Sequence, residues 1–212
     1  MLFKKMLRDI AKHKTQFLSI FLMAFLGVFV FAGVGGESVG LEVSVNDYYD
    51  ATNLADGWIY SVNLDDNFVD KINNLSPTKD SERQLVLDSI GNFSNDPEIT
   101  LHFLENNTIS KFYLLEGEDV NISDEDGVWL DKSFADAKNL KVGDNISFTF
   151  NGVSIEKEIK GLGYSPEYVY HASDSSIIPD FNKMGFAYLS YEAFPLSDVP
   201  YNVLLVDFDG SA

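Results

Sequence analysis

The side chains best suited to recognition lie in the stretch YSPEYVY, which runs from Tyr164 to Tyr170. Tyrosine and proline together offer rigid apolar area and hydroxyl groups, which is typical of surfaces that contact a protein partner or a substrate. Tyr164, Pro166, Tyr168 and Tyr170 are therefore the candidate contact residues. The alternative is structural: the tyrosines cover a sheet edge, and Pro166 blocks the pairing of a further strand.

Residues for catalysis or metal binding form no recognisable pattern. The chain has no cysteine, which excludes thiolate nucleophiles, disulfides and cysteine metal sites. His13, His102 and His171 are far apart, and an isolated histidine is more often a packing or surface residue than a ligand. Neither a P-loop nor a Gly-x-Ser-x-Gly motif occurs. We predict no catalytic residue, no cofactor and no metal ion.

Charge is divided sharply along the sequence. The residues before Phe17 include five basic side chains and one acid, a net charge of +4, whereas the remaining 10 basic and 32 acidic side chains give −22. Nucleic-acid binding needs clustered Lys and Arg, and no such cluster follows residue 16. The acidic run SDEDG at 123–127 lacks the spacing of a calcium loop, so we interpret it as a solvated loop.

An apolar stretch near the N-terminus is long enough to cross a lipid bilayer. Residues 17–34 carry no charge, and 18 residues of helix span about 27 Å, close to the hydrocarbon thickness. The glycines from Gly33 to Gly36 either permit close helix packing or mark the exit into a flexible linker, and we favour the exit. We expect a transmembrane helix over residues 17–36.

Residues 1–16 carry apolar side chains at helical spacing with basic side chains mainly on other faces, a pattern typical of an interfacial helix. Because basic residues precede the apolar run and acids dominate after it, we expect a cytoplasmic N-terminus and an extracytoplasmic main domain. A cleaved signal peptide is the alternative, although the apolar run is longer than the usual signal core.

The elements after the membrane segment predict an α+β domain. Helices are expected over Ser38–Tyr49, from an Asp65 or Asp66 cap to Pro77, and in SFADAKNL before the KVGD loop. Strands are expected at Trp58–Tyr60 and in the stretches RQLVLDSIG, EITLHFLE, KFYLLEG, GFAYLS and NVLLVDF. Asn151-Gly152 predicts a tight hairpin within 145–160, with Phe150 opposite Val153 and Phe148 opposite Ile155.

Several long stretches resemble FtsX-like ABC transporter permeases of Firmicutes type. They are RDIAKHKTQFLSIFLMAFLGVFVFAG, DYYDATNLADGW, GVWLDKSFADAKNLKVGDNISFTFNG and GLGYSPEYVYHASD, and the resemblance runs through almost the whole chain. The resemblance implies a cytoplasmic interfacial helix at 1–16, a transmembrane helix at 17–36, and a MacB-like extracytoplasmic core domain at 37–212. A β-rich inserted subdomain is expected at about 117–190, where Leu140 to Asp144 resembles a turn of that family.

The same resemblance implies a permease subunit of the cell membrane that works with a cytoplasmic ABC ATPase and a second permease copy or homologue. Export or extraction of a lipid, lipoprotein or peptide is the expected activity. Such proteins continue into further spanning helices, so a fragment is expected here. The alternatives are a membrane-anchored extracellular binding or adhesion domain and a membrane-tethered enzyme.

Overall fold

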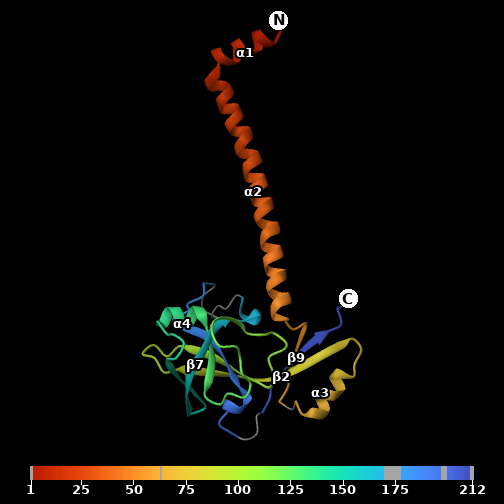
Figure 1. Ribbon diagram of the computed structural model, residues 1–212, viewed down its shortest axis with the longest axis vertical. Coiled ribbons are helices and arrows are strands. Elements are labelled where there is room, and N and C mark those ends of the chain that lie inside the picture. The colour runs from red at the N-terminus through yellow and green to blue at the C-terminus, as the bar shows by residue number, and fades with distance from the viewer. Residues whose placement is uncertain (1, 63, 170–177, 197–199, 211–212) are drawn as a thin grey trace. The chain divides into compact units, whose positions relative to one another are not determined.

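The computed structural model describes residues 2–62, 64–169, 178–196 and 200–210. The chain forms two compact units, which we call the helical unit (Met1–Tyr48) and the sheet unit (Tyr49–Ala212). Figure 1 shows the ribbon of both units.

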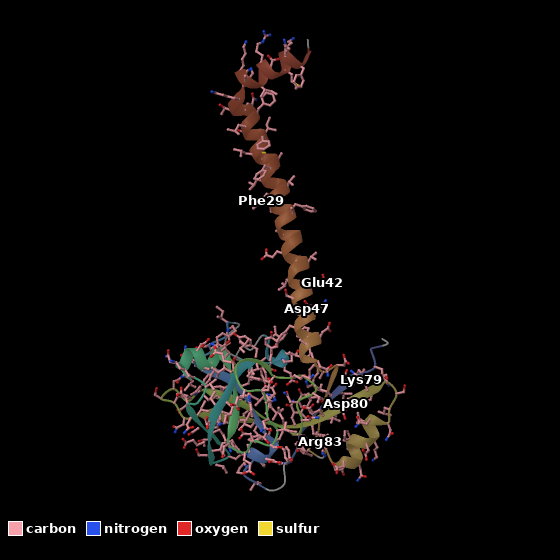
Figure 2. The ribbon with its side chains drawn as sticks, in the orientation of Figure 1. Phe29, Glu42, Asp47, Lys79, Asp80 and Arg83 are labelled. Atoms are coloured by element: carbon pink, nitrogen blue, oxygen red, sulfur yellow. The ribbon has the colours of Figure 1, made fainter. Side chains whose placement is uncertain are left out.

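The helical unit contains α1 (Leu2–Lys12) and most of α2 (Lys14–Thr52). α1 is amphipathic and ends at Lys12, whereas residues 14–16 of the expected first helix belong to α2, and α2 is long and apolar enough to cross a membrane. Its side chains change in kind along its length: Phe29 lies in the apolar part, whereas Glu42 and Asp47 lie in the later, polar part (Figure 2).

The structure corrects the expected exit at Gly33 to Gly36. All three glycines of this stretch lie inside α2, which continues to Thr52, so the helix does not end at the apolar run. The rest of α2 contains no proline, the residue that most strongly interrupts a helix. The expected helix at Ser38–Tyr49 is therefore the continuation of the same helix. It ends where Asn53 adopts the left-handed conformation, with φ of 49°.

The sheet unit is built on one nine-stranded mixed sheet, which confirms the α+β class. Its strands are β1 (Gly57–Tyr60), β2 (Thr78–Gly91), β3 (Glu98–Leu104), β4 (Tyr113–Gly117), β5 (Gly127–Asp131), β6 (Asn145–Phe150), β7 (Val153–Tyr164), β8 (Met184–Ser190) and β9 (Val203–Phe208). All the strand stretches expected from the sequence are present. The strands within 117–190 join the same sheet as the others.

Six of the strands close into a ring. β2 pairs with β3, β3 with β8, β8 with β5, β5 with β7, β7 with β6, and β6 returns to β2. Closure leaves these strands without free edges over the paired residues. β2 is long enough to leave the ring at its other end, where it pairs with β9, and β9 pairs with β1.

The main core fills one side of this ring. It contains inward residues of every ring strand, among them Leu85, Phe103, Leu130, Phe148, Ile159 and Leu189, all nearly or fully buried. Phe134 of α4 (Lys132–Lys138) packs into the same core. Because side chains alternate across a strand, His102 and Gln84 lie on the opposite face from Phe103 and Leu85.

The Asn151-Gly152 hairpin has the predicted register. Phe150 lies opposite Val153 and Phe148 opposite Ile155, and both turn residues have positive φ, 47° and 78°. Types with positive φ at both central positions match the twist of the strands, which is why this pair specifies the turn.

α3 (Asp66–Asn73) begins at Asp65, whose carboxylate accepts a hydrogen bond from the Phe68 amide at 2.8 Å, as the sequence predicted. The helix ends at Asn73, before Pro77, and Leu75 lies beyond it and is exposed. Figure 1 places α3 beside β2 and β9, and α4 at the other end of the sheet unit.

Candidate functional sites: a clamp at the start of the sheet unit and a polar pocket

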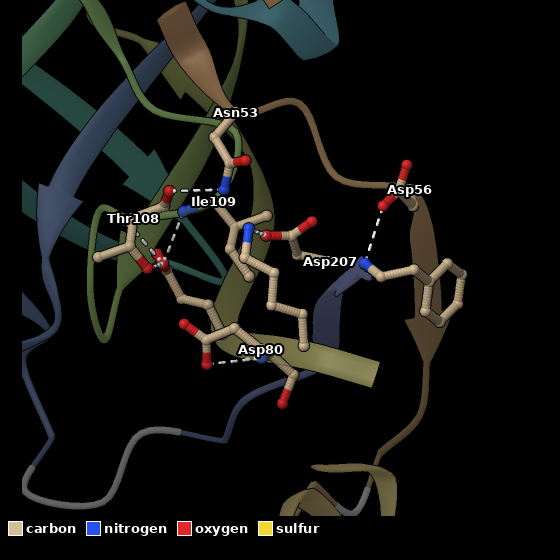
Figure 3. Close-up of polar contacts among 10 residues, drawn as sticks. Asn53, Asp56, Asp80, Thr108, Ile109 and Asp207 are labelled. Carbon is tan, nitrogen blue, oxygen red and sulfur yellow. Dashed lines mark hydrogen bonds and ion pairs between the residues drawn. The ribbon is translucent and has the colours of Figure 1, made fainter. Parts of the chain in front are cut away.

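The residues that end α2 are hydrogen-bonded to a loop between β3 and β4. The carbonyls of Thr52 and Asn53 accept hydrogen bonds from the amides of Lys111 and Ser110, both at 2.7 Å. The Asn53 side chain donates to the carbonyl of Thr108 at 3.0 Å (Figure 3). We call this arrangement of residues 52–56 against residues 105–112 the clamp.

A buried carboxylate on β2 fixes the loop side of the clamp. Glu82 is 5% exposed, and one of its oxygens accepts from the Thr108 amide, the Thr108 hydroxyl and the Ile109 amide at 2.8, 2.8 and 3.0 Å. Burial raises the pKa of Glu82, and the bonds from Thr108 and Ile109 oppose that rise. The loop is therefore attached to the sheet by one charged acceptor (Figure 3).

On the side away from the 105–112 loop, the clamp residue Asp56 contacts strand β9. The Asp56 amide donates to the carbonyl of Val206, and the Asp56 carboxylate accepts from the amide of Phe208 at 2.8 Å. Lys79 of β2 forms an ion pair with Asp207 at 2.7 Å (Figure 3). The start of the sheet unit and its last described strand thus lie side by side.

A pocket of about 330 Å³ opens on the face of the sheet away from the main core. Its floor comes from the neighbouring strands β1, β9, β2 and β3, and its walls come from Leu54 and the single-turn helix η1 (Pro166–Tyr168). The lining residues are Leu54, Trp58, Tyr60, Gln84, Val86, His102, Pro166, Glu167, Tyr168 and Val203.

Glu167 is the charged group of the pocket. One carboxylate oxygen accepts from the Trp58 indole N–H at 2.5 Å, and the other lies 3.5 Å from the Tyr188 hydroxyl. Burial raises the pKa of Glu167, while hydrogen bonds from Trp58, Gln84, Tyr188 and Ser110 oppose the rise. All of these donors are neutral side chains.

His102 joins the floor of the pocket to its wall. Its ring nitrogens lie 2.9 Å from the Gln84 side-chain oxygen and 2.6 Å from the Tyr168 hydroxyl. The imidazole stacks on Tyr188 with ring centroids 4.7 Å apart, and Tyr168 stacks on Phe186 at 4.6 Å. Burial raises the pKa of Tyr168, and the charge of Glu167 adds to that rise. Among the described residues, no group of His, Asp and Glu has the arrangement of a metal site.

The structure brings two of the four predicted contact residues together. Pro166 and Tyr168 line the pocket, and Tyr168 covers the face of β3 and β8 rather than a sheet edge. Tyr164 ends β7, pairs with Tyr113 and is 41% exposed, outside the pocket lining. Tyr170 lies outside the described residues.

Sequence reasoning did not select Glu167, Trp58, His102 or Gln84. Glu167 stands between two of the selected residues, and a lone acid inside an aromatic stretch is a usable signal. The other three come from strands far away in the sequence, and only the strand order β1-β9-β2-β3 brings them together.

Comparison with solved structures found proteins of low sequence identity that are similar to this chain. The chain is similar to the extracellular domain of an ABC-type transporter. That structure is the extracellular domain of the noncanonic ABC-type transporter YknZ from Gram-positive bacteria, with 12% identity, a TM-score of 0.49, and coverage of 73% of this chain and 83% of that one.

The periplasmic region of MacB from Actinobacillus actinomycetemcomitans is also similar, with 13% identity, a TM-score of 0.44, and coverage of 73% of this chain and 68% of that one. No protein-family model and no curated protein matches the chain.

Proposed function

We propose that the chain is the N-terminal part of an ABC transporter permease subunit. In this proposal α2 crosses the cell membrane, residues 1–16 lie in the cytoplasm and the sheet unit is extracytoplasmic. The sheet unit couples the ATP-driven motion of a separate cytoplasmic ATPase to export or extraction of a lipid, lipoprotein or peptide. A second permease copy or homologue completes the assembly.

The observation that carries this proposal is the clamp. α2 runs without interruption to Thr52, and the next residues are hydrogen-bonded to the 105–112 loop and to β9. In this proposal, the hydrogen bonds of residues 52–56 pass a displacement of Thr52 to the paired strands of the same unit. A domain that is only anchored at the cell surface does not need such an attachment, because a flexible tether is sufficient for binding.

The charge division supports the orientation. Lys4, Lys5, Arg8, Lys12 and Lys14 precede the apolar run, and basic residues close to a spanning helix favour the cytoplasmic side. The exposed basic side chains of α1 suit contact with anionic lipid head groups of the inner leaflet.

The test is purification of the tagged protein from its native membranes in a mild detergent. We expect an ATPase with a P-loop to co-purify, together with ATP hydrolysis above that of an unrelated single-span protein carrying the same tag. Isolation of the chain without an ATPase would favour the membrane-anchored binding or adhesion domain instead.

A further inference from the structure

The Glu167 pocket has an acidic group with no cationic partner among the residues described. None of the lining residues is Lys or Arg, and none of the ion pairs formed by described residues includes Glu167. A carboxylate removed from water is costly unless an opposite charge or strong donors compensate it. Here the donors are neutral, so a cation entering the pocket would supply the opposite charge that the carboxylate lacks.

The aromatic residues around Glu167 suit the same kind of ligand. Trp58 and Tyr60 alternate with Ile59 on the edge strand β1, and they are 40% and 75% exposed. A cation that sits over an aromatic face is attracted by the ring quadrupole, and Trp and Tyr are favourable partners. The indole N–H of Trp58 already binds Glu167, which holds the ring and the carboxylate together.

The remaining polar groups of the pocket are engaged with one another. Both ring nitrogens of His102 have partners in Gln84 and Tyr168. Glu167 accepts from Trp58 at 2.5 Å and lies 3.5 Å from the Tyr188 hydroxyl, and Gln84 and Ser110 also donate to it. Because all four donors are neutral, an ammonium group that takes the place of one of them adds the opposite charge that this carboxylate lacks.

We propose that this pocket binds an alkylammonium group, held between the Glu167 carboxylate and the aromatic faces of Trp58 and Tyr60. Its volume of about 330 Å³ lies at the small end of the range of about 300–1,000 Å³ for ligand pockets. A head group or a short amine fits this size better than a folded partner does. The inference goes beyond the proposed transport role and does not depend on it.

The experiment uses the full chain in phosphatidylglycerol nanodiscs, which contain no ammonium lipid, and n-butylammonium chloride as the probe. The chain has two tryptophans; Trp129 is 1% exposed with its N–H bonded to the Glu118 carbonyl, so Trp58 is the fluorescent reporter of the pocket. We expect a saturable change in emission with n-butylammonium, and none with n-butanol or with sodium chloride at equal ionic strength.

Glu167→Gln is the decisive variant, because it removes the charge but keeps an oxygen for the Trp58 N–H. The matched control is Glu192→Gln. Glu192 occupies the same place in the single-turn helix η2 (Tyr191–Ala193), where its amide donates to Ser190 as that of Glu167 donates to Ser165, but it is exposed. Glu167→Gln should weaken binding at least about tenfold, and Glu192→Gln should leave it unchanged.

Any of three results would overturn the proposal. They are equal binding of n-butanol and n-butylammonium, equal affinity of Glu167→Gln and the parent chain, and no saturable signal from the parent chain. A second set of nanodiscs containing phosphatidylethanolamine separates two sources of the ligand. Weaker apparent binding of n-butylammonium there indicates competition from a lipid head group, and unchanged binding indicates a free amine. Loss of the partner ATPase in the co-purification test would leave these results unaffected.

Discussion

Replacing Asp131 by asparagine should stabilise the sheet unit at neutral pH. Asp131 ends β5 and caps α4, accepts from the Ser133 amide at 2.9 Å and is 4% exposed. Burial raises the pKa of its carboxyl group to about 6 from a reference value of 3.8, and the nearby charge of Asp136 adds to the rise. The folded state therefore binds this proton more tightly than the unfolded chain.

The direction of the pH effect follows from that difference. Below about pH 4 the carboxyl group is protonated in both states. As the pH rises through the folded pKa of about 6, the stability associated with the proton is lost. A difference of about two pKa units corresponds to ~3 kcal/mol. Asparagine caps a helix about as well as aspartate and carries no charge, so it avoids this loss.

The assay is urea unfolding of the full chain in detergent, followed by tryptophan fluorescence between pH 4 and 8. We expect Asp131→Asn to match the parent near pH 4 and to exceed its unfolding free energy by about 2–3 kcal/mol at pH 7.5. The control is Asp65→Asn, the same substitution at the exposed N-cap of α3, which should change stability by less than about 0.5 kcal/mol. A destabilised Asp131→Asn at pH 7.5, or a difference independent of pH, would refute the reasoning.

Other substitutions test the clamp, the hairpin and the topology. Glu82→Ala leaves the Thr108 and Ile109 donors without their acceptor, so it should lower the unfolding free energy by about 3 kcal/mol and speed amide exchange in residues 105–112. Glu82→Gln should lower it less. Equal exchange in both variants and the parent would contradict the role given to Glu82. Gly152 has a φ of 78°, which alanine adopts at a cost, so Gly152→Ala should lower the unfolding free energy by about 1 kcal/mol. An unchanged urea midpoint would contradict the need for glycine at this position. Because the chain lacks cysteine, the variants Ser123→Cys and Lys5→Cys can each be labelled at a single site. A membrane-impermeant maleimide added to intact cells should modify Ser123→Cys but not Lys5→Cys. The reverse pattern would show the opposite topology.

Local signals in the sequence were sufficient for most of the elements, although strand β5 was not expected. Asp65 marks the start of α3 because its side chain satisfies an amide that the helix leaves free, and Asn151-Gly152 specifies its hairpin because both residues accept positive φ. Two local expectations were wrong: the exit at Gly33 to Gly36, and the extension of α3 to Pro77. Glycine weakens a helix by only about 1 kcal/mol per residue, so it does not by itself end one.

The arrangement of the strands could not be predicted in the same way. The ring depends on the parallel pairing of β3 with β8 and on the return of β6 to β2, which join segments far apart in the chain. The pocket depends on that arrangement, since Trp58, Gln84 and Glu167 come from β1, β2 and η1. The YSPEYVY stretch indicated part of the site, but the contact of Glu167 with Trp58 of β1 could not be predicted from that stretch.

Strand β2 connects the clamp to the pocket. Glu82 and Gln84 are two residues apart on one face of β2, so Glu82 holds the 105–112 loop while Gln84 contacts His102 in the pocket. The opposite face of β2, at Leu85, belongs to the closely packed main core, which resists deformation. We therefore expect a shift of this part of β2 to move both sites together. Leu54 is a second connection, because it lines the pocket and lies in the sequence between the clamp residues Asn53 and Asp56. If the clamp transmits motion and the pocket binds an alkylammonium group, occupancy of the pocket should alter amide exchange in residues 105–112, and Glu167→Gln should abolish that effect.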